Sequence, residues 1–439
     1  MILPGRGEPR AWLDAHVNLE TGVGTPRTRE RGAPTLERIS TLLQYLGSPQ
    51  LEYPAIHLTG TNGKTTTTRM ITQLLAAAGY TTGAYTSPHL QRVNERIVRN
   101  DEPISDDELD EQLRVVALVE QEIGLDPSYF EVLTGAAVRW FADVAVDVAV
   151  LEVGLGGTWD ATNVIDADVA VVTNVSIDHT QYLGTTAEEI ASEKAGIVKE
   201  KSMLVLGETD PDLARRFTDR GPVGVARRDT DFGVLGSATA VGGRVLDLYT
   251  PDARYSDVFV PLHGAHQADN AAIALAAAEV FAGTPLDDDA VREGFAAVRS
   301  PGRLEVVGRH PLVLLDGAHN VAGAHALRAA LSDEFAPSAR TLVVGMLRER
   351  DAAEMLTALG LDEVELLVCA PPPNPRALPP VQIADAALHL GFPEERIEVV
   401  DSVADAVSTA LLATPTEGEI IVTGSLYFVG AARGIFVKE

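Results

Sequence analysis

The segment from Ile56 to Arg69 constrains the fold of this chain more than any other. It reads Ile-His-Leu-Thr-Gly-Thr-Asn-Gly-Lys-Thr-Thr-Thr-Thr-Arg, an apolar entry followed by two glycines and a lysine–threonine pair. Gly60 and Gly63 allow the backbone to turn tightly, so that successive N–H groups and the start of the next helix face an anion. The segment therefore predicts a strand, a phosphate loop and a helix. The alternative is an ordinary glycine-rich turn with an incidental lysine.

The residues after the second glycine indicate a nucleoside triphosphate as the ligand. Lys64 would neutralise the β- and γ-phosphates, and Thr65 would offer its hydroxyl to a magnesium ion. The standard pattern has a glycine five positions before Gly63, where this chain has Leu58. We therefore interpret the segment as a shortened form of the P-loop.

Length and composition indicate a soluble protein with more than one domain. A chain of 439 residues is too long for one ordinary hydrophobic core. The chain contains no run of about 18 apolar residues, so no membrane span is predicted. The N-terminus, Met1 to Arg10, lacks an apolar signal-peptide core, so a cytoplasmic location is expected. The single cysteine, Cys369, excludes an internal disulfide, and its apolar neighbours predict a buried strand residue.

The charge of the chain is strongly negative. A formal net charge of −28 is combined with five lysines against thirty arginines. Such a chain is a poor partner for nucleic acid. An acidic, lysine-poor surface is similar to that of proteins adapted to high cytoplasmic salt, where screening over a few ångströms suppresses self-repulsion. We therefore expect a halophilic protein that binds no nucleic acid.

Strand-like apolar runs alternate with helix-like segments, the pattern of an open, largely parallel sheet with helices on both faces. The expected helices cover 35–46, 64–78, 106–123, 129–143, 187–197 and 268–281, and the expected strands cover 55–58, 83–85, 146–153, 169–174 and 202–206. Shorter β-like pieces are expected over 210–260, and residues 1–34 are expected to be irregular or partly helical.

A domain boundary is expected at Ser300-Pro-Gly-Arg303, which precedes a fresh run of strands. It gives residues 1–300 as a P-loop-containing, doubly wound parallel-sheet domain and residues 301–439 as a smaller Rossmann-like α/β domain. Expected strands of the second domain cover 313–315, 341–344, 365–368, 397–400 and 420–422.

Polar residues follow several of these strands, at the sheet edge where open α/β sheets bind ligands. Glu152 precedes Gly154-Leu-Gly-Gly157 and suits a magnesium ligand, although a strand-end or helix-capping acid is the alternative. Asp178-His179 follows the next strand and could hold a second cation, but an Asp-His pair alone is weak evidence. Lys194 and Lys199 stand out because lysine is so scarce in this chain.

Taken together, these motifs resemble the folylpolyglutamate synthase and dihydrofolate synthase branch of the Mur ligase superfamily. The matching segments run collinearly from about residue 35 to residue 434, in the following order: Leu58-Thr-Gly-Thr-Asn-Gly-Lys-Thr65, Tyr85-Thr-Ser-Pro-His-Leu90, Glu95-Arg-Ile97, Phe130-Glu-Val-Leu-Thr134, Leu151-Glu-Val-Gly-Leu-Gly-Gly157, Asp160-Ala-Thr-Asn163, Asp178-His-Thr180, Glu193-Lys-Ala-Gly-Ile-Val-Lys199, His263-Gly-Ala-His-Gln267 with Asn270, Ser300-Pro-Gly-Arg303, Leu315-Asp-Gly-Ala-His-Asn320 and Thr423-Gly-Ser-Leu-Tyr427. The shortened phosphate loop is also this family's own form.

The resemblance implies an ATP-dependent ligase that forms an amide. ATP would phosphorylate a carboxylate to an acyl phosphate, and the amine of L-glutamate would then attack it. The carboxylate would belong to dihydropteroate or to the last glutamate of a folate. Phosphoryl transfer of this kind depends mainly on positioning and charge neutralisation. The family is commonly monomeric, so a monomer is expected.

The resemblance also implies roles for individual residues. The expected ATP contacts are Gly60, Thr61, Asn62, Gly63, Lys64, Thr65, Thr66, Asn270, Arg303 and Asp316. One Mg²⁺ would be held by Thr65, Glu152 and Ser87, and a second by His179 and a carbamylated Lys194, with K⁺ as a further candidate ion. Lys64, Lys194, His179 and His319 are the expected catalytic residues, and Asn320 lies in the same motif as His319. Phe130 and Asp160 are expected to contact the acceptor acid in a folate pocket of the first domain, although Phe130 could equally be an ordinary core residue.

Two departures from the family pattern remain. Thr158-Trp159 replaces the usual Arg-Leu or Arg-Phe pair before Asp160, which puts substrate contacts there in doubt. Val321 replaces the usual proline after Asn320, a change that a helix start tolerates. Two alternatives also stay open: a Mur-type ligase acting on another acid, and a P-loop ATPase without ligase activity.

Overall fold

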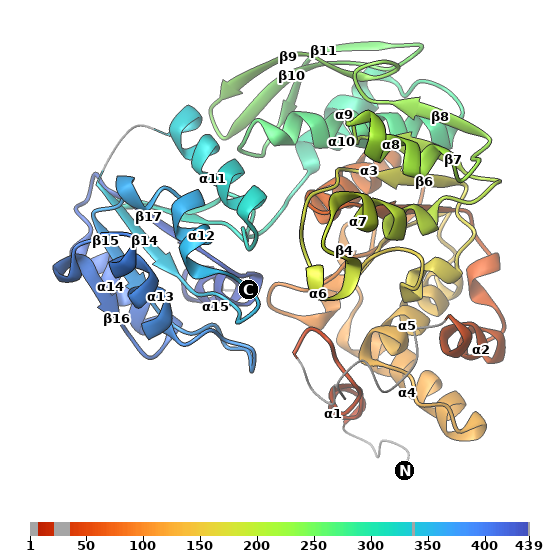
Figure 1. The fold of residues 1–439 in the computed structure, drawn as a ribbon. Coiled ribbons are helices and arrows are strands. Elements are labelled where there is room, and N and C mark those ends of the chain that lie inside the picture. Colours follow the sequence, from red (N-terminus) through yellow and green to blue (C-terminus); the bar gives the residue numbers. More distant parts are fainter. Residues whose placement is uncertain (1–7, 22–35, 336–338, 438–439) are drawn as a thin grey trace. The chain divides into compact units, whose positions relative to one another are not determined.

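The computed structural model describes residues 8–21, 36–335 and 339–437, and these divide into two compact units (Figure 1). Unit 1 comprises residues 1–238, 245–260 and 268–298, and unit 2 comprises residues 239–244, 261–267 and 299–439. Among the described residues, no helix is both long and apolar enough to cross a membrane.

Unit 1 is built on a sheet with the strand order β4-β3-β2-β5-β1-β6-β7-β8. Its strands are β1 Ala55–Thr59, β2 Thr82–Tyr85, β3 Ile97–Arg99, β4 Glu102–Pro103, β5 Val148–Glu152, β6 Val169–Val172, β7 Met203–Leu206 and β8 Gly224–Arg227. The strands from β2 to β8 in this order are parallel, whereas β3 and β4 continue the sheet in antiparallel pairing. Since β1 lies between β5 and β6, the loops after these three strands meet at one edge.

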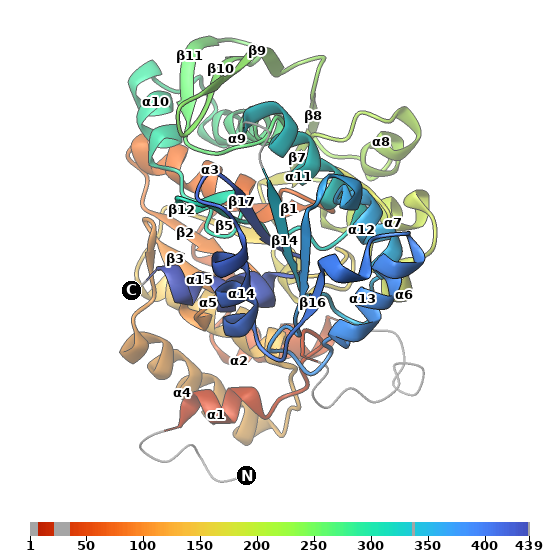
Figure 2. The same ribbon diagram turned by 90° about the vertical axis from the view of Figure 1, so that its left-hand side faces the viewer.

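Helices cover both faces of this sheet. They are α1 Pro9–Asp14, α2 Glu37–Tyr45, α3 Lys64–Ala77, α4 Asp106–Ile123, α5 Tyr129–Asp143, α6 Thr180–Leu183, α7 Ala187–Lys194, α8 Pro211–Thr218 and α10 Asp288–Ala297, with short 3-10 turns η1 Pro49–Leu51, η2 Val93–Arg96, η3 Ala161–Val164 and η4 Ala195–Ile197. Helix α1 runs beside α4, and α10 packs on α3 (Figure 2). The apolar faces of α2, α4 and α5 close one side of the core.

A three-stranded sheet, β11-β10-β9, follows β8 along the chain. Its strands are β9 Gly233–Ala240, β10 Gly243–Tyr249 and β11 Arg254–Val260, and helix α9 His266–Ala282 comes next. The tip of the β9–β10 hairpin and the start of α9 are counted with unit 2.

Unit 2 contains a second α/β sheet with the order β12-β13-β17-β14-β15-β16. Its elements are β12 Glu305–Arg309, β13 Leu312–Leu315, α11 Val321–Glu334, β14 Arg340–Val344, α12 Ala352–Ala358, η5 Leu361–Glu363, β15 Leu366–Cys369, α13 Pro380–His389, η6 Glu394–Arg396, β16 Ile397–Val399, α14 Val403–Ala413, β17 Glu419–Thr423 and α15 Leu426–Phe436. All pairs are parallel except β12 with β13. The expected fold class, a P-loop parallel-sheet domain followed by a Rossmann-like domain, is confirmed.

Cys369 is fully buried in β15, as its apolar neighbours predicted. Burial raises the pKa of its thiol to about 12, so the thiolate that a nucleophile needs is not populated near neutral pH. Of the expected N-terminal lead-in, residues 9–14 form α1, while residues 1–7 and 22–35 lie outside the described part of the chain.

Candidate active site

The phosphate loop connects the buried strand β1 to helix α3. Gly60 has a φ of 153° and Gly63 a φ of 82°, a backbone region that residues with a Cβ rarely adopt. A Cβ on Gly60 would lie 1.8 Å from Thr173 Oγ1, and one on Gly63 would lie 2.5 Å from Asn270 Oδ1. Both glycines are therefore required by conformation and by space. Asn270, on α9, lies beside the start of α3, where the resemblance implied a nucleotide contact.

The loop is fastened to the chain segment that follows β6. Thr61 N donates to Asn174 O at 2.9 Å, and Asn62 N donates to Asn174 Oδ1 at 3.1 Å. Thr173 Oγ1 donates to Asn62 O at 2.7 Å. These bonds hold the loop in a defined shape. Thr173 and Asn174 carry no motif in the sequence, although they are the last two residues of the predicted strand 169–174, at the ligand-binding edge.

Two lysines converge on the phosphate loop. Lys64 Nζ donates to Gly60 O at 3.1 Å and to Thr61 O at 3.2 Å, and Lys194 Nζ donates to Gly60 O at 2.8 Å. Lys194 is 4% exposed at the end of α7. Burial, together with the charge of Lys64, lowers the pKa of Lys194 to about 7, while Asp178 opposes this shift. A lysine in such surroundings is partly uncharged near neutral pH and can act as a nucleophile.

A hydroxyl and a carboxylate meet beside Lys64. Thr65 Oγ1 lies 3.0 Å from Glu152 Oε1 and 2.9 Å from Glu152 Oε2, and Ser87 N donates to Glu152 Oε2 at 3.3 Å. Glu152 is buried at the end of β5. These oxygens suit a hard cation such as Mg²⁺. Within the described ranges, no group of three or more His, Cys, Asp or Glu residues forms a metal cluster by itself, so a cation here would also need hydroxyl or phosphate oxygens.

His179 stands at the start of the short helix α6 with a φ of 51°. Its Nε2 lies 3.9 Å from Asp178 Oδ2, and its side chain is 42% exposed. Asp178 is buried, and its Oδ1 accepts the backbone N–H of His179 at 2.7 Å. This bond holds the left-handed turn and leaves the ring accessible. Thr66 is buried in the first turn of α3.

Phe130 packs against Gly154, at the start of the glycine-rich segment that follows β5. Its ring centroid is 5.8 Å from that of Tyr85, and a Cβ on Gly154 would lie 2.6 Å from its Cζ. Phe130 is half-buried. Asp160, in contrast, is buried, and its carboxylate accepts hydrogen bonds from Leu155 N at 2.9 Å and from Thr162 N at 3.0 Å.

Unit 2 carries the remaining expected residues at the carboxyl end of β13. Asp316 Oδ2 accepts from Leu304 N and Oδ1 from Ala318 N, each at 2.9 Å. Burial raises the pKa of Asp316, and the charge of Arg303 opposes that shift. His319 Nδ1 lies 2.9 Å from Gly317 O, and the side chain of Asn320 caps α11 through Gly323 N at 2.8 Å. Asp316 thus shapes the loop that presents His319.

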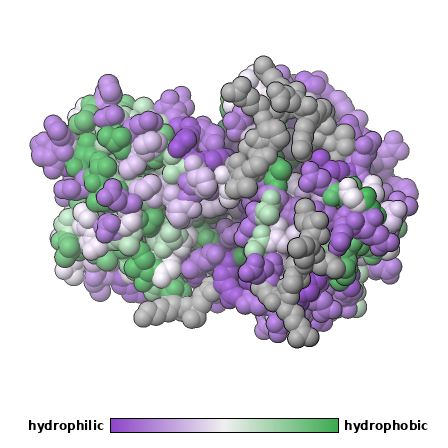
Figure 3. All heavy atoms as spheres, turned by 90° about the horizontal axis from the view of Figure 1, so that it is seen from below, coloured by the Kyte–Doolittle hydropathy of each residue, from purple (hydrophilic) through white to green (hydrophobic). Residues whose placement is uncertain are grey.

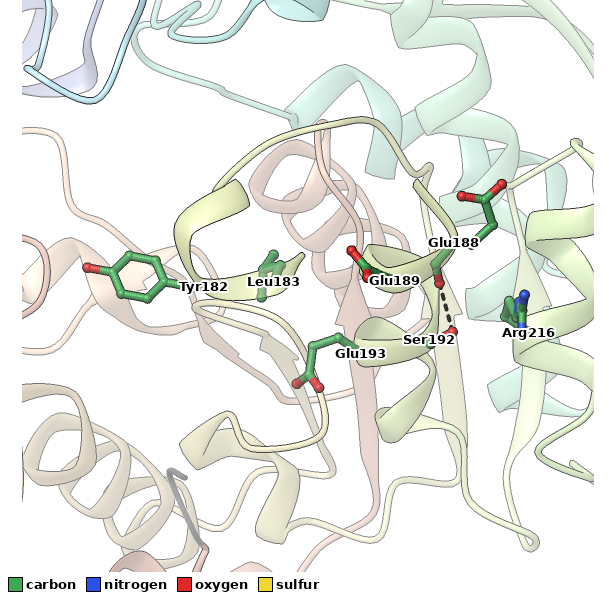
Figure 4. A pocket seen from close by; sticks show the side chains of 7 residues that line it. All are labelled: Tyr182, Leu183, Glu188, Glu189, Ser192, Glu193 and Arg216. Carbon is green, nitrogen blue, oxygen red and sulfur yellow. Dashed lines mark hydrogen bonds between the residues drawn. The ribbon is translucent and has the colours of Figure 1, made fainter. Parts of the chain in front are cut away.

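A surface hollow of about 460 Å³ lies between α6, α7 and α8 (Figure 4). It is lined by Tyr182, Leu183, Glu188, Glu189, Ser192, Glu193 and Arg216. Ser192 Oγ donates to Glu188 O at 2.7 Å, and the Glu189 side chain accepts from Thr185 N at the start of α7. Three carboxylates against one guanidinium would repel the phosphates of a nucleotide, so this hollow is not the nucleotide site.

The strand–loop–helix unit, with its two lysines and its hydroxyl–carboxylate pair, defines a P-loop nucleotide-binding protein with a second α/β domain. A family model described as Mur ligase middle domain matches residues 58–124 and 127–278, and one described as Mur ligase, glutamate ligase domain matches residues 302–426.

Individual proteins match over nearly the whole chain. The dihydrofolate synthase/folylpolyglutamate synthase of Mycobacterium tuberculosis is 43% identical over 443 residues, which cover 92% of this chain and 91% of that protein. A structure of folylpolyglutamate synthase from the same organism, complexed with ADP and AMPPCP, gives a TM-score of 0.87 at 43% identity and covers 92% of this chain and 96% of that chain. A bifunctional folylpolyglutamate synthase/dihydrofolate synthase with Mn, AMPPNP and L-glutamate bound gives a TM-score of 0.81 at 31% identity, covering 92% of this chain and 95% of that chain.

This chain belongs to the folylpolyglutamate synthase/dihydrofolate synthase family of the Mur ligases and is an ATP-dependent amide ligase. The resemblance seen in the sequence is thereby confirmed. Glu152 ends strand β5 of unit 1, Lys194 ends helix α7 of the same unit, and Asp316 follows strand β13 of unit 2.

Proposed function

We propose that this ligase joins L-glutamate to the carboxylate of a folate, of dihydropteroate, or of both. The observation that carries the proposal is the convergence of Lys64 and Lys194 on the Gly60 carbonyl beside the Thr65–Glu152 pair. Two cationic groups and a cation site suit transfer of a phosphoryl group to a carboxylate, where charge builds up on the phosphate oxygens. The names of the relatives supply the folate, dihydropteroate and glutamate substrates.

Within this proposal, the N–H groups from Gly60 to Thr66 cradle the phosphates of ATP, and Asn270 contacts the adenine. Thr65, Glu152 and Ser87 would hold a divalent cation, whose bound positive charge would offset the charge of the phosphates. His179 and Lys194 are the proposed ligands of a second Mg²⁺. K⁺ is a candidate for a third bound ion. Arg303 and Asp316 are proposed ATP contacts, and His319 a proposed catalytic residue.

Lys194 suits the second cation only after modification. The uncharged Nζ would attack the carbon of CO₂, form an N–C bond and lose a proton, which leaves a carbamate anion with two oxygens. The low pKa of Lys194, about 7, makes the uncharged amine available for that step. A carbamate replaces a buried ammonium by oxygen donors that Mg²⁺ prefers.

The acceptor acid is proposed to lie against Phe130, whose ring is half-buried beside Tyr85. Asp160 belongs to the same side of the site, but its carboxylate already accepts hydrogen bonds from its own chain. We therefore assign to Asp160 the shaping of the acceptor site.

Product identification tests the substrate assignment. Purified protein with MgATP and L-glutamate is incubated with dihydropteroate, with tetrahydrofolate, or with no acceptor, and the products are weighed by mass spectrometry. A glutamate-sized mass gain on both acceptors is expected for the bifunctional enzyme, and a gain on one assigns a single activity. No gain on either would contradict the proposal and favour a Mur-type ligase for another acid.

A further inference from the structure

The strand that leads into the phosphate loop contains a buried histidine that the proposed chemistry does not use. His57 stands in β1, and its side chain is 0% exposed. Its Nε2 lies 2.7 Å from Thr162 Oγ1, whereas its Nδ1 is buried and has no hydrogen-bond partner within the described ranges. An unpaired buried nitrogen destabilises a fold, and a valine or isoleucine in this central strand would avoid that cost. The contact made by Nε2 therefore needs an explanation other than packing.

The hydroxyl of Thr162 connects His57 to Asp160. Thr162 Oγ1 lies 2.5 Å from Asp160 Oδ1, so the single hydroxyl proton is donated to the carboxylate. The Thr162 oxygen must then accept a proton from His57, which places the ring hydrogen on Nε2. Burial, with a smaller contribution from the charge of Lys199, lowers the pKa of His57 to about 3 and keeps the ring neutral.

Asp160 depends on these donors. It is 3% exposed, and burial raises the pKa of its carboxyl, a shift that the hydrogen bonds it accepts oppose. The charged form of this buried carboxyl is favoured by the N–H and O–H donors of Leu155 and Thr162, which work against the burial. Hydrogen bonds in a chain polarise one another, so the bond from His57 strengthens the one that Thr162 makes to the carboxylate.

The segment from Gly154 to Gly157, which Asp160 holds in place, lies between two parts of the site. At one end, Gly154 is in close contact with the ring of Phe130. At the other end, a Cβ on Gly157 would lie 2.7 Å from Lys194 O, so the backbone there packs on the end of α7. Thr59 Oγ1 also donates to Gly156 O at 3.0 Å. A shift of this glycine segment would therefore change the separation of Phe130 and Lys194.

We propose that His57 and Thr162 are positioning residues of the ligase. Their hydrogen-bond chain holds Asp160, and through it the segment from Gly154 to Gly157, at the spacing that brings the acceptor acid to the phosphate-binding lysines. The inference rests on the proposed function, because it assigns the acceptor acid to the Phe130 side.

Paired variants test this role. His57→Leu removes the donor at similar volume, whereas His57→Gln keeps an N–H near the position of Nε2. Thr162→Val removes the hydroxyl isosterically, and Thr162→Ser keeps it. We expect His57→Leu and Thr162→Val each to lower kcat/KM for the acceptor acid about tenfold, with ADP affinity, measured by calorimetry, within about twofold of wild type. In the Gln and Ser variants, kcat/KM should recover to within about threefold of wild type. The double variant of His57→Leu and Thr162→Val should be no less active than the less active of the two single variants, because both residues act through one hydrogen-bond chain.

The inference is overturned if His57→Leu keeps full acceptor efficiency, if His57→Gln is as impaired as His57→Leu, or if the two losses multiply in the double variant. An equal loss of ADP affinity would also overturn it, since that indicates general damage to β1. Should His57→Leu fail to fold, the Thr162→Val and Thr162→Ser pair decides alone. If the wild-type protein ligates glutamate to neither acceptor, the proposed function is refuted. If the wild-type protein is active and the variants are as active as it is, only this inference is refuted.

Discussion

At the scale of single residues, the site depends on charged groups held out of water. Lys194 is nearly fully buried, with its Nζ against the Gly60 carbonyl, and Glu152 is buried with both carboxylate oxygens near the Thr65 hydroxyl. Such groups are costly to bury without partners. The phosphates and cations of a bound nucleotide would supply partners of opposite charge, so these residues are expected to affect catalysis far more than they affect folding.

Lys194→Ala should lose most ligase activity, by about a hundredfold or more, while the fold survives. The cavity left by the side chain should admit a short carboxylic acid such as acetate, whose oxygens can replace those of the proposed carbamate. Partial recovery with acetate, and none with a short amine, is the expected pattern in steady-state assays. Full activity of the variant without any additive would remove Lys194 from the site.

Lys194 also predicts how stability depends on pH. Its pKa is about 7 in the folded protein, against 10.5 for an ordinary lysine. Between these values the unfolded chain binds more protons, so stability rises as pH increases from about 7 to about 10. Lys194→Met cannot titrate and should lack this contribution. Urea unfolding of both proteins across that range, in bicarbonate-free buffer, measures the difference, and parallel curves would contradict a buried, unmodified lysine.

Glu152→Gln should raise the Mg²⁺ concentration needed for half-maximal activity about tenfold or more, because a neutral amide is a weaker ligand for a hard cation. Glu188→Gln, a change of the same kind on the exposed surface of α7, is the matched control. A magnesium titration that Glu152→Gln leaves unchanged would exclude Glu152 as a ligand.

At the scale of elements, the sequence predicted best where local chemistry decides the structure. Helices α4 and α5 begin and end where expected. Their starts are fixed by capping boxes, which Ser105 forms with Glu108 and Ser128 with Glu131. Strand β5 is shorter than expected, although its flanking valines, Val146 and Val153, are both buried. Val146 N donates to Phe141 O of α5, and Val153 N donates to Leu58 O of β1 just past the end of the assigned strand. Apolar character shows burial, but it does not show where a ladder ends.

The site was also predictable only in part. The phosphate loop and Glu152 could be located from motifs, since strand ends of a parallel sheet share one edge. The bonds from Thr173 and Asn174 to the loop, and the chain from His57 to Asp160, could not. Apart from the bond between Thr162 and Asp160, they join residues at least 105 positions apart. No local pattern in the sequence specifies such pairs.

The loop predicts a sharp contrast between two glycines. Gly60→Ala should abolish tight nucleotide binding, because its Cβ would overlap Thr173 Oγ1. Gly79→Ala is the control: Gly79 has a φ of 95°, but nothing lies within 4 Å of its added Cβ. That variant should lose only about 1 kcal/mol of stability and bind ADP normally. Calorimetric titration with ADP measures both, and equal affinities would show that the close approach at Gly60 is unnecessary.

At the scale of the whole molecule, the net charge of −28 remains the outstanding feature. Hydrophilic residues cover much of the face drawn in Figure 3, with hydrophobic ones interspersed. We propose that the protein is adapted to high salt, where counter-ions screen the repulsion between its carboxylates. The thermal midpoint should then rise markedly from low salt to molar KCl. Equal midpoints would contradict the adaptation.

The proposed reaction passes through an acyl phosphate on the acceptor acid. When the amine of glutamate attacks that intermediate, the C–O bond breaks and one carboxylate oxygen leaves with the phosphate. An acceptor labelled with ¹⁸O in its reacting carboxylate should therefore transfer one ¹⁸O to each inorganic phosphate released, which the isotope shift in ³¹P NMR detects. Unlabelled phosphate would show that water, and not the acceptor, attacks ATP, and would contradict the ligase mechanism.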